Sequence, residues 1–246
     1  MPDMSIKILK FKPQLKIQDF GFWITFLAFT FCILHHPCYA APCYGTKMPE
    51  KKEVFLGLQN YTIFKRYLKD DYGKFMAVQD FFLLSYGVFD WLAIDLKGGA
   101  GNFRQHPVGS DEIDYSTYLG GGYGFRLKVY EAHKLKTVFG FQHISIHPKT
   151  VSLGASKHKA VSDDWQFSLL ASWAFPKITP YIGTRWSRHD YIHWVDGNRK
   201  LKKSDLTKSL GLILGFDLPI TEKFWLNLEG SVFDSEASAF SLNYKF

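Results

Sequence analysis

The sequence is poor in cysteine and has no apolar run of the length that a membrane-spanning helix needs. Its three cysteines, Cys32, Cys38 and Cys43, include no Cys-x-x-Cys pair, so neither a disulfide framework nor a structural zinc site is expected. The mean hydropathy of −0.12 excludes a helical membrane protein with many spans. The formal charge of +7 over 246 residues is too small and too dispersed to indicate nucleic-acid binding. No nucleotide-binding motif is present, and we expect no cofactor.

Aromatic residues, in contrast, are abundant. They make up 17% of the chain, which excludes a disordered protein. Together with the 20 glycines they favour β-structure.

The N-terminal segment has the layout of a secretory signal. A lysine-rich stretch precedes Phe20–Leu34, an uncharged run of 15 residues that is short for a membrane-spanning helix. Small residues before Ala41 predict cleavage after Ala40, so that residues 1–40 are a signal peptide; the alternative is an uncleaved anchor helix. Residues 41–53 are then expected to be a short periplasmic segment.

The remaining chain alternates apolar and polar residues with period two rather than with a helical period. The alternation is clearest in Ser209–Leu218, Phe224–Phe233 and Ala239–Phe246. Further segments that alternate are Trp91–Gly101, Thr117–Tyr130, Trp165–Phe175 and Tyr181–Trp194, and less regular ones are 54–66, 75–86 and 137–147. These segments predict about ten strands.

Short and long connections alternate between these predicted strands. Short turns at one end and long polar loops at the other are typical of an up-and-down barrel in the bacterial outer membrane. We therefore predict an all-β fold, a transmembrane antiparallel up-and-down β-barrel over residues 54–246. Eight or twelve strands are the alternatives to ten.

Charges in the middle of strands decide which face of the barrel is apolar. A soluble secreted barrel would turn its apolar face inward. In lipid, however, each mid-membrane Arg or Lys would cost about 2–4 kcal/mol, so these charges are expected to line the lumen and to pair there. The predicted lumen network consists of Asp95, Lys97, Arg126, Lys128, Arg185, Asp217, Glu229 and Lys245.

Aromatic residues near the strand ends indicate two interfacial girdles. The girdle at the short turns is predicted from Trp91, Tyr130, Trp173, Phe175, Tyr181, Phe224 and Phe246. The girdle at the long loops is predicted from Phe103, Tyr118, Trp165, Tyr191 and Trp194.

The last strand ends in Phe240, Leu242, Tyr244 and Phe246, an alternation that closes on Phe. This pattern resembles the C-terminal assembly signal of bacterial outer-membrane β-barrel proteins. The resemblance implies recognition by the barrel-assembly machinery and a position in the outer membrane, among its lipids and lipopolysaccharide. A ten-stranded barrel has a narrow interior, so we expect a side-chain-filled lumen and a structural or surface-interaction role. The alternative is a small pore.

A second candidate function comes from His143 and Ser145, which share one face of a strand. Their His-x-Ser spacing looks like that of outer-membrane phospholipase A and of lipid A deacylases, which implies His143 as base and Ser145 as nucleophile. Ile146 stands where those families carry Asn, and the nearest following acids are Asp163 and Asp164. We therefore expect the triad to lack its third member.

Two further clusters are weaker candidates. Arg188, His189, Asp190 and His193 resemble the His and Asp residues that ten-stranded outer-membrane proteases carry at their rim, but only Asp111 and Asp114 offer a second acidic pair. The same cluster has no diagnostic metal-ligand spacing, and no metal site is predicted. In the stretch 196–208, the basic residues Arg199, Lys200, Lys202 and Lys203 are predicted to contact lipopolysaccharide phosphates, or else to form a solvated loop.

Overall fold

The computed structural model describes residues 44–246. The predicted signal peptide and cleavage site lie outside the described residues. Within them, no helix is long and apolar enough to cross a membrane.

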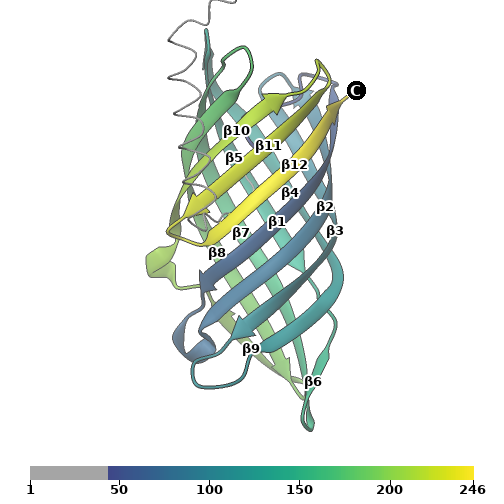
Figure 1. The fold of residues 1–246 in the computed structure, drawn as a ribbon, viewed down its shortest axis with the longest axis vertical. Helices are drawn as coiled ribbons and strands as arrows, with labels where there is room; N and C mark the ends of the chain where they lie inside the picture. The colour runs from purple at the N-terminus through teal and green to yellow at the C-terminus, as the bar shows by residue number, and fades with distance from the viewer. Residues whose placement is uncertain (1–43) are drawn as a thin grey trace, which may run out of the picture. The chain divides into compact units, whose positions relative to one another are not determined.

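Ten strands form a closed antiparallel barrel, as Figure 1 shows. They are β1 (Val54–Tyr67), β2 (Lys74–Phe89), β3 (Leu92–His106), β4 (Ile113–Ala132), β5 (Leu135–Ile146), β7 (Ser156–Trp173), β8 (Thr179–Val195), β10 (Leu210–Pro219), β11 (Phe224–Val232) and β12 (Glu236–Lys245). Two short strands, β6 (Val151–Leu153) and β9 (Asn198–Lys203), form hairpins with β7 and β8, and the 3-10 turns η1 (Asp70–Tyr72) and η2 (Leu206–Lys208) lie in loops. The pairings of β1 with β12 and of β7 with β8 close the sheet. The predicted fold is confirmed, with ten strands.

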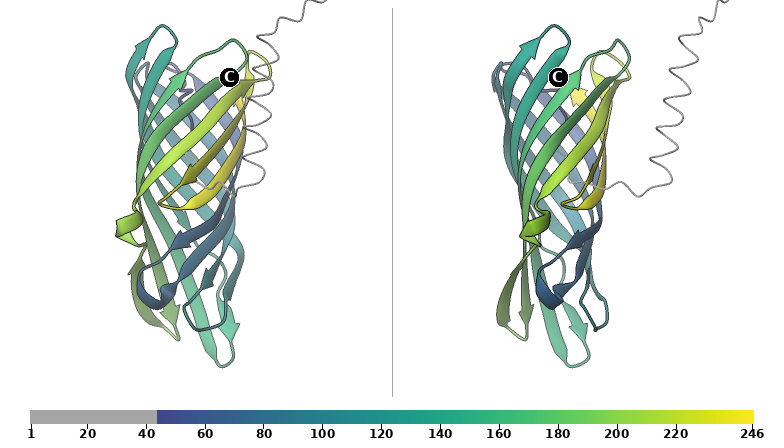
Figure 2. Two further views of the ribbon diagram at one scale, coloured as in Figure 1. Left: turned by 60° about the vertical axis from the view of Figure 1, so that its left-hand side comes forward. Right: turned by 90° about the vertical axis from the view of Figure 1, so that its left-hand side faces the viewer.

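The strands differ in length, and this divides the barrel into two regions. The strands β10, β11 and β12 have nine or ten residues, whereas β4 has 20 and β7 has 18. About 9–11 tilted residues cross a bilayer. The short strands therefore mark the membrane belt, and the outer parts of the long strands form a distal extension beyond it. Figure 2 shows this extension continuing past the ends of β10–β12.

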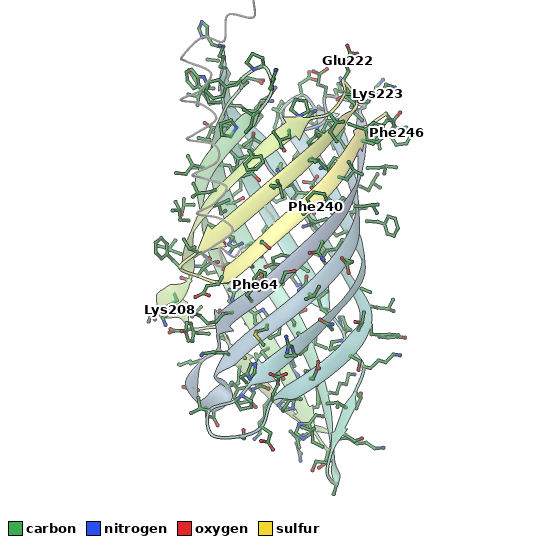
Figure 3. All side chains as sticks on the ribbon, viewed as in Figure 1. Phe64, Lys208, Glu222, Lys223, Phe240 and Phe246 are labelled. Atoms are coloured by element: carbon green, nitrogen blue, oxygen red, sulfur yellow. The ribbon has the colours of Figure 1, made fainter. Side chains whose placement is uncertain are left out.

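The outer surface of the membrane belt is apolar. Exposed side chains on it include Leu58, Phe82, Leu84, Ile94, Leu96, Leu169, Ile182, Leu214, Phe240 and Leu242. At the short turns, Phe89, Trp91, Tyr130, Trp173, Phe175, Phe224 and Phe246 are exposed as a girdle. At the other boundary the exposed aromatics are Phe64, Tyr67, Tyr118 and Phe233. Figure 3 shows Phe246 at the short-turn end and Phe64 near the ends of β10–β12.

The predicted girdles are wrong at three positions. Tyr181, Phe103 and Tyr191 are buried inside the barrel. Phe103 and Tyr191 belong to an apolar cluster with Phe75, Tyr115 and Ile146 that fills the distal extension. The lumen is therefore ionic only in part, because beyond the bilayer the outer wall meets water and the apolar face turns inward. The segments 54–66 and 75–86 alternate irregularly because inward-facing apolar residues also occur on them within the belt, at Phe55 and Leu83.

The N-terminal strap, residues 44–52, occupies the barrel mouth at the short turns. Met48 packs against the inward-facing Ala93 and Val138. The Lys52 amide donates to the Gly87 carbonyl at 2.7 Å. A Cβ atom at Gly87 would lie 1.8 Å from the Glu50 carbonyl oxygen, so only glycine allows the strap to pass. The strap belongs to the segment 41–53 that the sequence predicts to be periplasmic, and it contacts the lumen wall through Lys47 and Met48.

Candidate functional site

The lumen near the strap is bridged by a buried ion pair. The Arg126 guanidinium donates to both carboxylate oxygens of Asp95, at 2.8 and 2.7 Å. It also donates to the carbonyls of Lys47 at 2.7 Å and Tyr44 at 3.3 Å, which ties the strap to β4. Arg126 and Asp95 are both buried, so the bidentate geometry offsets the desolvation of the two charges.

A second group of polar side chains lies on the opposite wall, on β8, β10 and β11. The Tyr181 hydroxyl donates to Glu229 at 2.8 Å, and the Asn227 amide donates to Tyr181 at 2.9 Å and to Asp217 at 2.8 Å. All four side chains are buried.

A chain of hydrogen bonds crosses the lumen where the membrane belt meets the distal extension. Lys97 donates to Gln142 at 3.0 Å, Gln142 to Gln166 at 2.8 Å and Gln166 to Asp164 at 2.6 Å. Arg66 donates to Asp164 at 3.0 Å, so the chain links β3 to β1 across the interior.

Arg66 continues this chain to the turn between β11 and β12. It donates to Ser187 at 2.9 Å, and Ser187 donates to Asp234. Asp234 pairs with Arg185, which donates to it at 2.8 and 2.9 Å, and both side chains are fully buried. Hydrogen-bonded polar side chains therefore cross the barrel interior at this level.

Six residues of the predicted lumen network lie inside the barrel, and two do not. Asp95, Lys97, Arg126, Arg185, Asp217 and Glu229 are buried. Lys128 pairs with Glu131, and Lys245 pairs with Glu53, both at the rim of the short turns. The expected pairing of these two lysines with lumen acids is therefore wrong, because the strand ends bring rim glutamates closer. Arg66 and Asp234 were missed, since no alternation marks the bulged end of β1 or the turn after β11. Asp164 was named only as an acid near Ser145, because the predicted strand began at Trp165.

His143 and Ser145 face outward on β5, where they meet β7. The Ser145 hydroxyl contacts Asp163, its cross-strand partner, and lies 2.9 Å from Nε2 of His147. His143 stacks on Trp165, with 4.1 Å between ring centroids, and its Nε2 is 3.9 Å from Asp163. The strand register thus places Asp163 against Ser145 rather than against His143, so an acid lies in the cluster without forming the third member of the predicted triad.

This outer-wall cluster, Ser145, His147, Asp163 and His143, lies at the boundary of the membrane belt. Ser145 is ten residues along β5 from Leu135, and Asp163 is ten residues from Trp173 on β7. At about 3.3 Å per residue and a tilt near 40°, ten residues rise about 25 Å, the height of an outer-membrane apolar band. The cluster therefore meets both lipid and water.

The hydrogen-bond order in this cluster differs from that of a serine-hydrolase triad. There the acid orients the histidine, whereas here Asp163 contacts the serine itself. The Ser145 proton can pass to either Asp163 or His147. His147 is the histidine within hydrogen-bond distance of Ser145, and its amide is fixed by the Leu119 carbonyl at 2.9 Å.

Strand alternation separates the predicted cluster on β8 between the two faces of the barrel wall. Arg188 and Asp190 pair on the outer wall at 2.7 Å, while His189 and His193 are buried on the inner face. Within residues 44–246, no group of three or more His, Cys, Asp or Glu side chains is arranged to hold a metal ion.

The basic stretch forms strand β9 rather than a loop. Arg199 lies opposite Trp194 and Lys203 opposite Asp190, so both face outward. Lys200 and Lys202 face the other side, and Lys202 pairs with Asp70 at 3.1 Å.

The four residues of the predicted assembly signal lie on or just after β12. Phe240, Leu242 and Phe246 are exposed on the outer wall, and Tyr244 packs on Phe224 with 4.6 Å between ring centroids.

No family model and no curated protein matches the sequence. Among solved structures, the translocator domain of autotransporter NalP from Neisseria meningitidis is 11% identical with a TM-score of 0.47, over 93% of this chain and 96% of that one. The COG4313 outer membrane channel from Pseudomonas putida F1 is 11% identical with a TM-score of 0.40, over 85% and 100%. Outer membrane protein AlkL is 13% identical with a TM-score of 0.38, over 85% and 95%. The closed sheet and the apolar outer surface identify this chain as a β-barrel of the outer-membrane type.

Proposed function

We propose that this chain is a non-conducting barrel of the bacterial outer membrane that carries its distal extension as a surface for interactions outside the cell. The observation that carries this proposal is the filled interior. Three features at different heights support it: the strap, the hydrogen-bond chain from Lys97 to Asp234, and the aromatic cluster around Phe103.

Planar-bilayer recording of the purified full-length protein tests this proposal. We expect no stepwise conductance, with a known porin as positive control. Regular unitary steps would favour the small-pore alternative. Heat-dependent gel mobility and outer-membrane fractionation test the location, and the same preparations show whether the chain begins near Ala41.

The outward basic residues support contact with lipopolysaccharide. Arg199 and Lys159 both lie over the Trp194 ring, at 5.8 and 5.2 Å from its centroid, just beyond the membrane belt. Phosphates of the outer leaflet would meet these cations there. We also propose that the assembly machinery recognises the apolar alternation of β12. Truncation of Phe246 is therefore expected to reduce assembly.

A second candidate function, hydrolysis of a lipid ester, is favoured by the 2.9 Å distance between Ser145 Oγ and His147 Nε2. In this reaction His147 accepts the Ser145 proton as the hydroxyl oxygen attacks the ester carbonyl. The acyl group then passes to Ser145, the alcohol leaves with the proton from His147, and water releases the acid. Asp163 would stabilise the protonated histidine. His143, the base predicted from the sequence, lies against the Trp165 ring and has no contact with Ser145 in this scheme.

Release of fatty acid from outer-membrane lipid in detergent micelles tests this candidate. Ser145→Ala should abolish release, and His147→Ala should lower it about 100-fold or more. His143→Gln should have a smaller effect. Ser152→Ala, on the exposed β6, is the matched control. Activity that survives Ser145→Ala, or its absence from the wild type, rejects the hydrolase.

A further inference from the structure

A cavity of about 260 Å³ opens at the short-turn end of the barrel. The strap forms one wall with Thr46 and Lys47, and β10 and β11 form another with Asp217 and Trp225. The turn between β4 and β5, the start of β5, the end of β7 and the start of β8 also line it. The volume is just below that of drug-sized pockets, so an occupant must be small.

Asp217 gives the cavity a buried acceptor. Its side chain is 4% exposed, and its Oδ1 accepts a hydrogen bond from Asn227 at 2.8 Å. Its Oδ2 has no hydrogen-bond partner among the described residues. A buried carboxylate oxygen without a donor is costly, and a bound ammonium group would remove this cost.

The rim of the same cavity is basic. Lys47, Lys134 and Lys136 line it, with Glu131 as the acid at the rim. Glu131 is already paired with Lys136 at 3.0 Å and also with Lys128. The Lys47 ammonium lies 3.9 Å from the Trp225 ring centroid. A simple cation would be repelled by three lysines, and a simple anion would leave Asp217 Oδ2 unmatched.

We propose that this cavity binds a small zwitterion, of the size of an amino acid or dipeptide, from the side of the short turns. The ammonium group of the ligand meets the Asp217 carboxylate, and its acidic group meets Lys134 or Lys136. Leu135, Ala174 and Pro219 line the cavity as apolar surface for the stem between the two groups. Since Thr46 and Lys47 form part of the wall, the site is complete only when the strap is in place.

Isothermal titration of the full-length barrel in detergent tests the proposal with probes of matched length: 4-aminobutyrate, butylamine and butyrate, with glycylglycine as a dipeptide. The zwitterions are expected to bind at least tenfold more tightly than either half-molecule. Asp217→Asn should weaken their binding at least tenfold, and Lys134→Gln should weaken it less. Lys223→Gln, at the same end but outside the cavity, should leave binding unchanged.

Several results would overturn the proposal. They are no binding by any probe, equal binding of the amine and the zwitterion, or unchanged binding in Asp217→Asn. Heat-dependent gel mobility shows whether Asp217→Asn folds. If it does not, the comparison of probes on the wild type and on Lys134→Gln decides the question.

Discussion

The membrane belt and the distal extension are built from the same strands with opposite polarity. On β3, Ile94 and Leu96 face outward in the belt while Asp95 and Lys97 face the lumen. Further along the same strand, Phe103 is buried inside. Its neighbour Arg104 is exposed. The alternation of side chains does not change, but the solvent outside the wall changes from lipid to water.

This comparison explains how one set of strands encloses two different interiors. In the belt, charged groups must turn inward and pair, which leaves a lumen bridged by hydrogen bonds. In the extension, the interior is packed like the core of a soluble protein, and the chain from Lys97 to Asp234 joins the two regions.

The largest effect is expected where a buried charge loses its partner. Arg185→Met leaves Asp234 unpaired inside the barrel and should lower the free energy of unfolding by about 3–5 kcal/mol. Urea unfolding of the barrel in liposomes measures this. Arg104→Met, which breaks an exposed pair with Glu112 in the extension, is the control and should cost about 0–1 kcal/mol. Equal losses in the two variants would contradict the internal role of Arg185.

A smaller effect is expected from a charge on the outer wall. Leu96→Arg places a cation against lipid and should destabilise the barrel by about 2–4 kcal/mol. Ser116→Arg, at an exposed position of the extension, should change stability by less than about 0.5 kcal/mol. The same unfolding assay compares them. If Leu96→Arg were as mild as Ser116→Arg, the position of the belt would be wrong.

The smallest effect distinguishes the two apolar surfaces. Ile146→Val, inside the extension, should cost about 0.5–1.5 kcal/mol because the core cannot refill the lost methyl group. Ile182→Val, on the lipid-facing wall, should cost less, since lipid chains fill the space. A larger loss for Ile182→Val would indicate that this wall packs against protein.

The sequence predicted the belt well because lipid enforces strict alternation there. Leu92–Leu96, Leu210–Leu214 and Phe240–Phe246 could be assigned to the outer face from period two alone. The extension was harder, because Phe103 and Tyr191 read as interfacial aromatics when the length of the crossing is unknown. Nothing in the sequence shows where along a 15-residue or 17-residue strand the bilayer ends.

The outer-wall cluster was predictable only in part. His143 and Ser145 could be placed on one face from their spacing. Asp163 could not be assigned to Ser145, because the nine residues between β5 and β7, 147–155, leave the register open. The strap contacts were equally hidden, since carbonyl groups of Tyr44 and Lys47 bind Arg126 and leave no side-chain pattern.

The central claim is that the solvent of the outer wall changes along one strand, and spin labels on β3 test it most directly. Single cysteines at Ile94, Leu96, Ala100 and Arg104, in a chain whose own cysteines are replaced by serine, would carry a nitroxide in a reconstituted bilayer. The labels at Ile94 and Leu96 should be relaxed by oxygen dissolved in lipid, and the label at Arg104 by a water-soluble nickel complex. If all four labels were accessible to the nickel complex, the outer wall would face water throughout and the membrane belt would not exist.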